Sequence, residues 1–367
     1  MKIGILTQAL HCNYGGLLQN YALQTILKRM GHEPITIDRH IYRSSNWPKT
    51  VAKWLIRYVK PSFEVSYLSE KQRAYLASRQ RRFVDNNIRC SEPLYKQADF
   101  DAWVAGEQFG AYVVGSDQVW RPRYSANIKN YFLDFAADDV KKVAYAASFG
   151  VDHWEYSAEI TPLIAELAQK FDAISVREHS AVDLCSKYLH VRSKWVLDPT
   201  MLLGADDYKQ FVSSAGRKSD YVVTYFLEKS AECDKLVERV KTQTNTRDVV
   251  SNDIVSMFER GCSLKDSVYL SVEDWISNIY YSSVVVTDSF HGAVFSILFN
   301  KPFVVKLNGT RGNTRLESLL SDFGLTDCLC SDIEHMKVPT IDWTKVNARL
   351  NDRRNESIDF LRNALEK

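Results

Sequence analysis

The sequence contains no apolar run that approaches the roughly 20 residues of a membrane-spanning helix. Its N-terminus, MKIGILTQAL, has only a short apolar run before His11, and no secretory signal peptide is recognisable there. The 7 cysteines are odd in number and show no paired spacing, so we expect free thiols in a reducing compartment. Cys328 and Cys330 are too close together and too isolated for a zinc site, and no metal is expected. These absences favour a cytoplasmic protein.

The motifs of several enzyme classes are missing as well. The chain has no G-x-G-x-x-G, no P-loop, no zincin motif, no G-x-S-x-G and no DxD-like acidic pair in a supporting context. A dinucleotide site is therefore poorly supported, and no bound cofactor is expected. The net charge of +2 gives no electrostatic reason to expect a nucleic-acid partner.

The sequence does contain a regular alternation of buried strands and amphipathic helices. With 367 residues, of which 45% are apolar and 25% charged, it can bury a core in each of two domains. In the first half, KIGILT predicts a strand, HCNYGG a loop, LLQNYALQTILKRMGH a helix and EPITIDR a second strand. Further strands are predicted over 111–116, 141–148, 172–177 and 194–199. This order predicts a parallel sheet.

A second alternation begins at YVVTYFLE, residues 221–228. It continues through DVVSND, VEDWISNIYYS, SVVVTD, GAVFSILF and FVVKL, and residues 342–367 predict a closing helix. We therefore expect an α/β fold with an N-terminal domain over 1–200, a C-terminal domain over 201–367 and a cleft between them. In open sheets of this kind, ligands bind at the C-terminal ends of the strands.

Residues 41–90 differ in character and predict a helical insertion in the first domain. Between Tyr42 and Arg89 there are eleven Lys or Arg and three acidic residues, mixed with Trp and Tyr, and no strand pattern is evident. A basic, aromatic segment of this kind suits peripheral contact with an anionic membrane surface. A pair of solvated helices with a basic face is the alternative interpretation.

One histidine stands at the junction of a buried strand and a buried helix. In SVVVTDSFHGAVFSILFNKPFVV, a helix is expected to begin near Phe290 or His291, with Asp288 or Ser289 as its N-cap. A helix N-terminus attracts anions, and Gly292 allows close approach. A histidine there suits acid–base catalysis, and one satisfied by backbone and packing is the alternative.

Basic residues stand where they would suit an anionic ligand. Lys306 follows the next predicted strand, and Arg311 and Arg315 lie in LNGTRGNTRLESLL. Arg177 ends a strand of the first domain in SVREHS. The planar fork of arginine matches a carboxylate or a phosphate. A solvated loop explains the first three positions as well, and a salt bridge between Arg177 and Glu178 explains the fourth.

Small and polar residues follow other predicted strands. Gly15 and Gly16 stand just before the first predicted helix, where glycine lets the backbone approach a ligand. Ser116 and Asp117 follow the strand that begins at residue 111 and would suit binding of a hydroxyl group. A simple turn is the alternative there.

Taken in order, eight segments resemble the polysaccharide pyruvyl transferase family, and within it a Ser-Phe-His-Gly subgroup. They are NYGGLLQNYALQ, VVGSDQVWRP, YFLDFA, KKVAYAASFG, ISVREHSA, WVLDPTMLL, VVVTDSFHGAVFSILFNKPFVV and RGNTRLESLL. The resemblance implies two Rossmann-like domains in a glycosyltransferase-B-like arrangement. It also implies phosphoenolpyruvate as donor and, as acceptor, a sugar of a capsular polysaccharide, an exopolysaccharide or a lipid-linked precursor. The product would be a pyruvate ketal.

Carried over residue by residue, the resemblance makes His291 the catalytic residue and Arg177 a donor-binding residue. Many members have Arg-Leu-His where this chain has Ser289-Phe290-His291, and Arg315 is the expected substitute for the missing arginine. Asp327 and Cys328 stand where many relatives have a basic residue. The remaining donor-site candidates are Ser289, Lys306 and Arg311, and the acceptor-site or loop candidates are Asn13, Tyr14, Gly15, Gly16, Ser116, Asp117 and Ser148.

Two other functions stay open. A nucleotide-sugar glycosyltransferase of the same architecture would be stabilised by a nucleotide and inert toward phosphoenolpyruvate. A non-catalytic module that binds anionic glycans would keep its ligand when His291 is changed and would release no phosphate.

Overall fold

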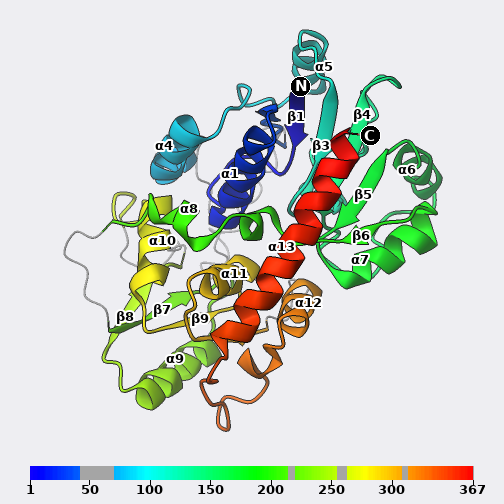
Figure 1. The fold of residues 1–367 in the computed structure, drawn as a ribbon. Coiled ribbons are helices and arrows are strands. Elements are labelled where there is room, and N and C mark those ends of the chain that lie inside the picture. The colour runs from blue at the N-terminus through cyan, green and yellow to red at the C-terminus, as the bar shows by residue number, and fades with distance from the viewer. Residues whose placement is uncertain (42–69, 214–219, 254–262, 308–312, 367) are drawn as a thin grey trace, which may run out of the picture.

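A computed structural model describes residues 1–41, 70–213, 220–253, 263–307 and 313–366 of the chain. Two parallel sheets, each flanked by helices, make up the molecule (Figure 1). The prediction of an α/β protein with two Rossmann-like domains is therefore confirmed.

The first sheet has six parallel strands in the order β2-β1-β3-β4-β5-β6. Their bounds are Lys2–Leu6 (β1), Glu33–Ile37 (β2), Ala111–Val114 (β3), Lys141–Ala147 (β4), Ala173–Val176 (β5) and Lys194–Trp195 (β6). Helices cover the sheet, so the strands are short apolar runs such as KIGIL in β1, in which nearly every position is buried. All six strands begin at the positions expected from the sequence, within one residue.

The helices of the first domain are α1 (Tyr14–Arg29), α5 (Gln97–Ala105), α6 (Thr161–Ala168) and α7 (His179–Leu184). Two further helices, α3 (Glu70–Leu76) and α4 (Ser78–Asn87), fall within the predicted insertion. Residues 42–69 of that insertion lie outside the described residues. The arginines of α4 are among those that suggested contact with a membrane, and that contact stays a prediction.

The second sheet has five parallel strands in the order β11-β10-β9-β7-β8. Their bounds are Tyr221–Tyr225 (β7), Asp248–Ser251 (β8), Val284–Thr287 (β9), Phe303–Lys306 (β10) and Leu329–Cys330 (β11). The helices are α9 (Ala231–Thr244), α10 (Val272–Tyr281), α11 (Phe290–Leu298) and α12 (Thr314–Asp322). Every residue of α11 is buried, as its all-round apolar sequence FHGAVFSIL requires.

The chain crosses between the domains twice. A 3-10 turn over Pro199–Leu202 and α8 (Ala205–Lys209) lead from β6 to the second domain. The C-terminal helix α13 (Trp343–Glu366) runs back to lie beside β4, as its red ribbon in Figure 1 shows. There the Ser357 hydroxyl accepts a hydrogen bond from the Leu197 N–H at 3.0 Å. A domain boundary near residue 200 stays a prediction.

The two domains share one hydrophobic core. A single cluster of buried side chains extends from β1 and α1 in the first domain to β7, α10 and α11 in the second. Tyr14 of α1 contributes to it: its ring stacks on Trp275 at 5.5 Å, and its hydroxyl donates to the Leu270 carbonyl at 3.0 Å. The position of one domain against the other is therefore fixed by apolar packing.

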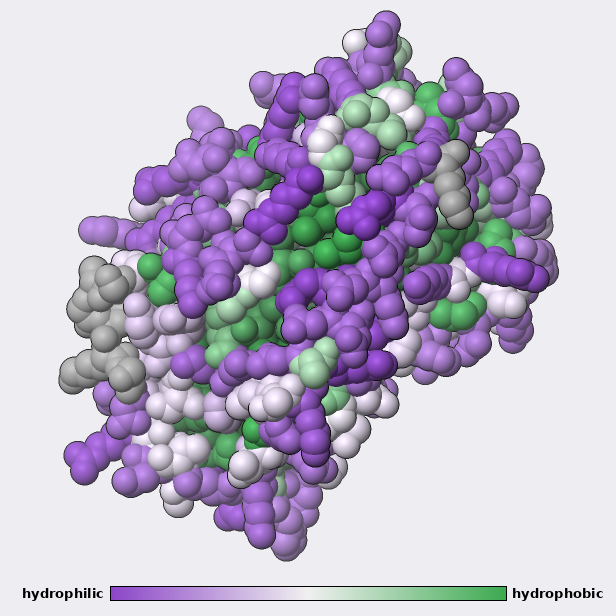
Figure 2. Space-filling view, in the orientation of Figure 1, coloured by the Kyte–Doolittle hydropathy of each residue, from purple (hydrophilic) through white to green (hydrophobic). Residues whose placement is uncertain are grey.

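Hydrophilic side chains cover most of the face seen in Figure 2, with smaller hydrophobic areas between them. Within the described ranges, no helix is both long enough and apolar enough to cross a bilayer.

Candidate active site

His291 lies where the two domains meet. It is the second residue of α11, it is 6% exposed, and its ring packs directly against Gly15 in the first turn of α1. A Cβ atom at Gly15 would lie 1.9 Å from Nδ1 of His291, so only glycine fits. The opposite ring nitrogen, Nε2, lies 3.7 Å from Oδ2 of Asp198. That separation is an ion-pair distance and too long for a hydrogen bond.

This packing corrects the prediction for the two glycines. Helix α1 begins at Tyr14, whereas the sequence pattern placed its start at Leu17. Gly15 and Gly16 are therefore helical residues and do not precede the helix. The imidazole from the second domain occupies the space that a side chain at position 15 would need, which explains a glycine inside the helix.

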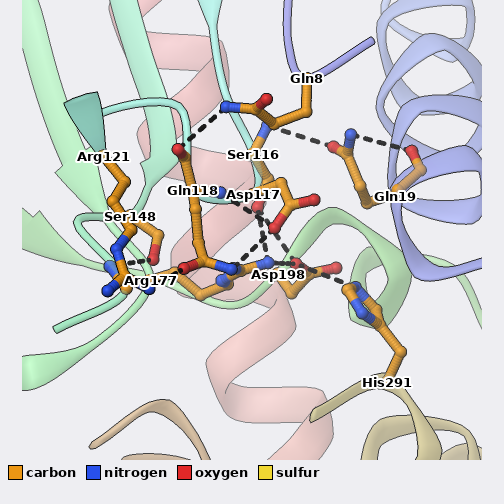
Figure 3. Close-up of polar contacts among 12 residues, drawn as sticks. Gln8, Gln19, Ser116, Asp117, Gln118, Arg121, Ser148, Arg177, Asp198 and His291 are labelled. Atoms are coloured by element: carbon orange, nitrogen blue, oxygen red, sulfur yellow. Dashed lines mark hydrogen bonds and ion pairs between the residues drawn. The ribbon is translucent and has the colours of Figure 1, made fainter. Parts of the chain in front are cut away.

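Asp198 is the centre of the buried polar cluster. Its Oδ1 accepts hydrogen bonds from the N–H and the hydroxyl of Thr200 at 3.0 and 2.7 Å. Its Oδ2 accepts from Nη1 of Arg177 at 2.8 Å and from the Ser116 hydroxyl at 3.1 Å. Figure 3 shows Asp198 between Arg177 and His291. Burial opposes ionisation of this carboxyl, but His291, Arg177 and Thr200 outweigh it and hold its pKa well below the usual range.

Arg177 follows β5 and is also buried. Its Nη2 donates to Oδ1 of Asp117 at 3.3 Å, and its guanidinium lies over the Phe290 ring at 4.8 Å. Burial alone would lower the pKa of Arg177, but Asp198 and Asp117 raise it above its ordinary value. The salt bridge with Glu178 that the sequence suggested is replaced by these two carboxylates.

Ser116 and Asp117 form the turn after β3. Gln19 and Thr7 hold this turn: the Ser116 N–H donates to Oε1 of Gln19 at 3.1 Å, and the Thr7 hydroxyl donates to the Ser116 carbonyl at 2.8 Å. Burial would raise the pKa of Asp117, and the positive charges of Arg177, His291 and Arg315 lower it.

Glu178 is a second buried carboxyl group of the cluster. Its Oε1 accepts from the Ser148 hydroxyl at 3.0 Å and from the N–H groups of Phe149 and Gly150 at 3.0 and 3.3 Å. Burial raises its pKa above the ordinary value. Ser148 thus holds a carboxylate in place, and its hydroxyl is already engaged.

Arg315, near the start of α12, is a second arginine, close to Arg177 and Asp117. Burial and then the nearby charge of Arg177 lower its pKa to about 10. Its Nε atom is buried without a hydrogen-bond partner, as are Nε of Arg177 and Nε2 of His291. Buried polar groups are normally satisfied. Three such nitrogens, two of them on arginines, therefore lie in one cluster, where they could donate hydrogen bonds to an anionic ligand.

The other predicted site residues fall elsewhere or play different roles. Lys306 forms an ion pair with Glu232 at 2.8 Å, away from this cluster. Ser289 stands at the N-cap of α11, but its hydroxyl makes no capping hydrogen bond. Asn13 is exposed at the start of α1, and Tyr14 packs between the domains. Arg311 lies outside the described residues.

Three residues of the cluster were missed from the sequence: Asp198, Glu178 and Gln19. Asp198 stands inside the strand predicted over 194–199, but β6 ends at Trp195, so Asp198 follows the strand as Asp117 follows β3. Glu178 is adjacent to Arg177, and the sequence alone suggests only a salt bridge between the two. Gln19 lies within a helix, where nothing in the local pattern distinguishes it from a surface glutamine. In the part of the chain that the structure describes, no group of three metal-ligating side chains comes together.

The sequence profile of the polysaccharide pyruvyl transferase family matches residues 13–309, more than half of the chain. The chain belongs to this family. The matched range contains Asp198 and every candidate site residue except Arg311 and Arg315. No curated protein sequence matches the chain.

The fold of this pyruvyl transferase family member is similar to that of solved structures with very different sequences. Arabidopsis thaliana UGT89C1, complexed with UDP-L-rhamnose, is 7% identical, with a TM-score of 0.51 over 99% of this chain and 98% of that chain. S. aureus MnaA, in a co-structure with UDP, is 13% identical, with a TM-score of 0.48 over 97% of this chain and 90% of that chain. At these identities the likeness concerns the fold alone, and the glycosyltransferase-B-like arrangement was expected from the sequence.

A glycine pair tests the packing of His291. We predict that Gly15→Ala lowers the free energy of unfolding by about 1–3 kcal/mol, because the added methyl group must displace the imidazole. Gly16→Ala is the matched control: its Cβ would meet Asn13 at 3.6 Å, an ordinary contact, and alanine favours a helix by up to about 1 kcal/mol. Urea denaturation of both variants is the measurement. Equal stabilities would contradict the contact.

The depressed pKa of Asp198 makes the stability of the protein depend on pH. Its contribution to stability is complete above the unfolded pKa of about 3.9 and is lost as pH falls below it. We predict that Asp198→Asn costs about 3–5 kcal/mol at pH 7, because Arg177 loses a buried partner. The difference from the wild type should narrow below about pH 4. Denaturant titrations of both proteins at several pH values measure this difference in the free energy of unfolding. A difference independent of pH would contradict the depressed pKa of Asp198.

Proposed function

We propose that this protein uses phosphoenolpyruvate to form a pyruvate ketal on a sugar of a surface polysaccharide or of its lipid-linked precursor, with release of phosphate. Membership of the polysaccharide pyruvyl transferase family supports pyruvyl transfer to a glycan. The buried cationic cluster supports a donor with more than one negative charge.

The observation that carries the proposal is the pair of buried arginines with unsatisfied Nε atoms. Phosphoenolpyruvate has a carboxylate and a phosphate, which are the two groups that a guanidinium fork binds best. Both terminal nitrogens of Arg177 already bind carboxylates, whereas Arg315 lies near the positive charge of Arg177. A bound anion would relieve that repulsion, so Arg315 is the main proposed donor contact.

His291 would supply the proton that starts the reaction. Its Nδ1 edge packs against Gly15, which leaves Nε2 as the nitrogen that faces the buried cluster. The Asp198 carboxylate faces this edge at 3.7 Å. A proton from Nε2 to the methylene carbon of the donor makes C2 electrophilic, and two sugar hydroxyls then add as phosphate leaves. The arginines would stabilise the carboxylate and the departing phosphate.

The acceptor contacts stay proposals. Asn13 is exposed two residues before Gly15, and Asp117 accepts a hydrogen bond from Arg177, so both would suit contacts to hydroxyl groups of an acceptor. Ser116 and Ser148 already donate to Asp198 and Glu178, so each would act by holding a carboxylate. We also propose a cytoplasmic location and contact with the membrane through residues 41–89.

Phosphate release from phosphoenolpyruvate, measured across a panel of galactosides and N-acetylhexosamines, tests the function. We predict that the wild type releases phosphate with some acceptor and that His291→Ala lowers the rate by about 10²–10⁴-fold. Affinity for phosphoenolpyruvate should change only a few-fold. Use of a nucleotide sugar, with phosphoenolpyruvate inert, would contradict the proposal, and a folded His291→Ala variant with normal turnover would make the histidine a packing residue.

An arginine pair tests the donor site. We predict that Arg315→Ala lowers kcat/KM for phosphoenolpyruvate by about ten- to a hundredfold, since a charged hydrogen bond contributes roughly 1.5–3 kcal/mol. Arg315→Lys should restore only part of this kcat/KM, because lysine lacks the bidentate fork. Arg349→Ala is the matched control. Arg349 forms an ion pair with Asp322, which lies at the opposite end of α12 from Arg315. Arg177→Ala should also weaken donor use, and it needs a folding check because it leaves two carboxylates unpaired.

A further inference from the structure

Glu178 is a buried carboxyl group to which the proposed reaction assigns no role. It stands between Arg177 and the start of α7, and its side chain is completely buried. Its Oε1 atom accepts three hydrogen bonds, from the Ser148 hydroxyl and from the N–H groups of Phe149 and Gly150. Its Oε2 atom is also buried and makes no hydrogen bond. One oxygen of this group is therefore fully engaged, and the other can take a further partner.

This uneven engagement of the two oxygens fits a carboxylic acid. A protonated carboxyl group has one carbonyl oxygen, which accepts hydrogen bonds, and one O–H, which donates. Oε1 takes the place of the carbonyl oxygen, because all three of its partners are donors. Oε2 then carries the hydrogen and needs an acceptor. Burial raises the pKa of Glu178 above its ordinary value, although Arg177 and Arg315 act in the opposite direction, and so favours this form.

Arg315 belongs to the same part of the cluster. Helices α7 and α12 pack against each other; Glu178 precedes α7, and Arg315 is the second residue of α12. The two side chains are close enough for the charge of each to act on the pKa of the other. Nε of Arg315 is, like Oε2 of Glu178, buried without a hydrogen bond. These two atoms do not bond to each other, so both can bind a third group.

A phosphate group matches both atoms. Its oxygens accept hydrogen bonds from a guanidinium and from a carboxylic acid. An ionised Glu178 would repel it, so a bound phosphate favours the protonated carboxyl group. His291, in contrast, acts on the carboxyl groups of Asp198 and Asp117. The cluster therefore offers two proton-carrying groups, of which Glu178 is the one associated with Arg315.

We propose that Glu178 is a second catalytic residue, which gives its Oε2 proton to the departing phosphate of the donor and then takes the proton of the second acceptor hydroxyl. This inference deepens the proposed function and rests on it. Arg315 would hold the phosphate against Glu178. The two acid–base roles are thereby divided: His291 acts on the methylene carbon, and Glu178 acts on the phosphate.

The proton balance closes with these two groups. Nε2 of His291 gives a proton to the methylene carbon, the first hydroxyl oxygen bonds to C2, and its proton returns to His291. The bond between C2 and the phosphate oxygen then breaks. Its electron pair stays on that oxygen, which takes the Oε2 proton of Glu178 and leaves as hydrogen phosphate. The second hydroxyl oxygen bonds to C2, and its proton passes to Oε2. One phosphoenolpyruvate and two hydroxyl groups give one ketal and one hydrogen phosphate, and both side chains end as they began.

Binding of phosphoenolpyruvate without an acceptor tests the protonation of Glu178 apart from turnover. Calorimetric titrations in buffers of different ionisation enthalpy count the protons that are taken up on binding. Because a bound phosphate raises the pKa of Glu178, the wild type should take up a proton once the pH exceeds the pKa of the free carboxyl group. Glu178→Gln donates at any pH, so its affinity should change only a few-fold. Its proton uptake should be lower, by a difference that approaches about one proton as pH rises.

The comparison depends on the other groups that titrate nearby. Beside Glu178 these are Arg177, Arg315 and, in the turn after α7, Cys185. The pKa of Arg177 lies above its ordinary value, that of Arg315 is about 10, and that of Cys185 is raised to about 12. Of these four groups, Glu178 is the one whose titration falls below about pH 9. Protonation of His291 or of phosphoenolpyruvate itself is common to the wild type and Glu178→Gln.

Phosphate release with the active acceptor gives the second measurement. We predict that Glu178→Gln lowers kcat by about 10²–10⁴-fold, with KM for phosphoenolpyruvate changed only a few-fold. Glu166→Gln is the matched control, since Glu166 is an exposed glutamate of the same domain that pairs with Lys170 at 3.6 Å. It should match the wild type in proton uptake and in kcat.

Ser148→Ala gives a test that leaves the carboxyl group in place. It removes one donor to Oε1, and the loss of that donor raises the pKa of Glu178. The pH at which proton uptake begins should therefore shift upward relative to the wild type. A purely structural role of Glu178 would leave this pH unchanged.

The failure of this inference differs from that of the proposed function. Equal proton uptake by the wild type and Glu178→Gln, or a folded Glu178→Gln with kcat within about threefold of the wild type, would overturn the role of Glu178 and leave the proposed function standing. If Glu178→Gln does not fold, an unchanged pH dependence of uptake in Ser148→Ala would overturn this role. A wild type that releases no phosphate with any acceptor would overturn the proposed function and this inference together.

Discussion

The site depends on one constraint: charged groups from both domains are buried together where α11 meets α1. Moving charges out of water is costly, so each buried carboxylate must have a cation or several hydrogen-bond donors. The Asp198 carboxylate has partners from both domains: it binds Arg177 of the first and lies beside His291 of the second. Gly15 allows the approach, since any larger residue would push the imidazole away. Any shift of one domain would leave part of this cluster uncompensated.

Buried ion pairs contribute little net stability, because desolvation offsets most of their attraction. The stability that holds the domains together is instead apolar, and comes from the core that continues from α1 into α10 and α11. The cluster is also incompletely satisfied, with buried nitrogens of Arg177, Arg315 and His291 left without hydrogen bonds. Under the proposed function, these nitrogens would bind the anionic groups of the donor.

Much of the fold follows from local sequence. Short apolar runs such as KIGIL and VVVT predicted the strands, and the polar residues after them predicted the sheet edges where Ser116, Asp117, Arg177 and His291 lie. Features that depend on distant partners were not predictable in this way. The need for glycine at position 15 of α1 comes from a histidine far along the chain, and the capping expected of Ser289 is absent.

Deuterium incorporation tests most directly the central claim that His291 protonates phosphoenolpyruvate at the interface of the domains. The wild type would be incubated with phosphoenolpyruvate and an active glycan in D₂O, and the product analysed by mass spectrometry. The account predicts a pyruvate ketal whose methyl group carries one deuterium, formed together with one inorganic phosphate, and no such product from His291→Ala. A ketal methyl group without deuterium, or a labelled ketal formed at the normal rate by His291→Ala, would contradict it.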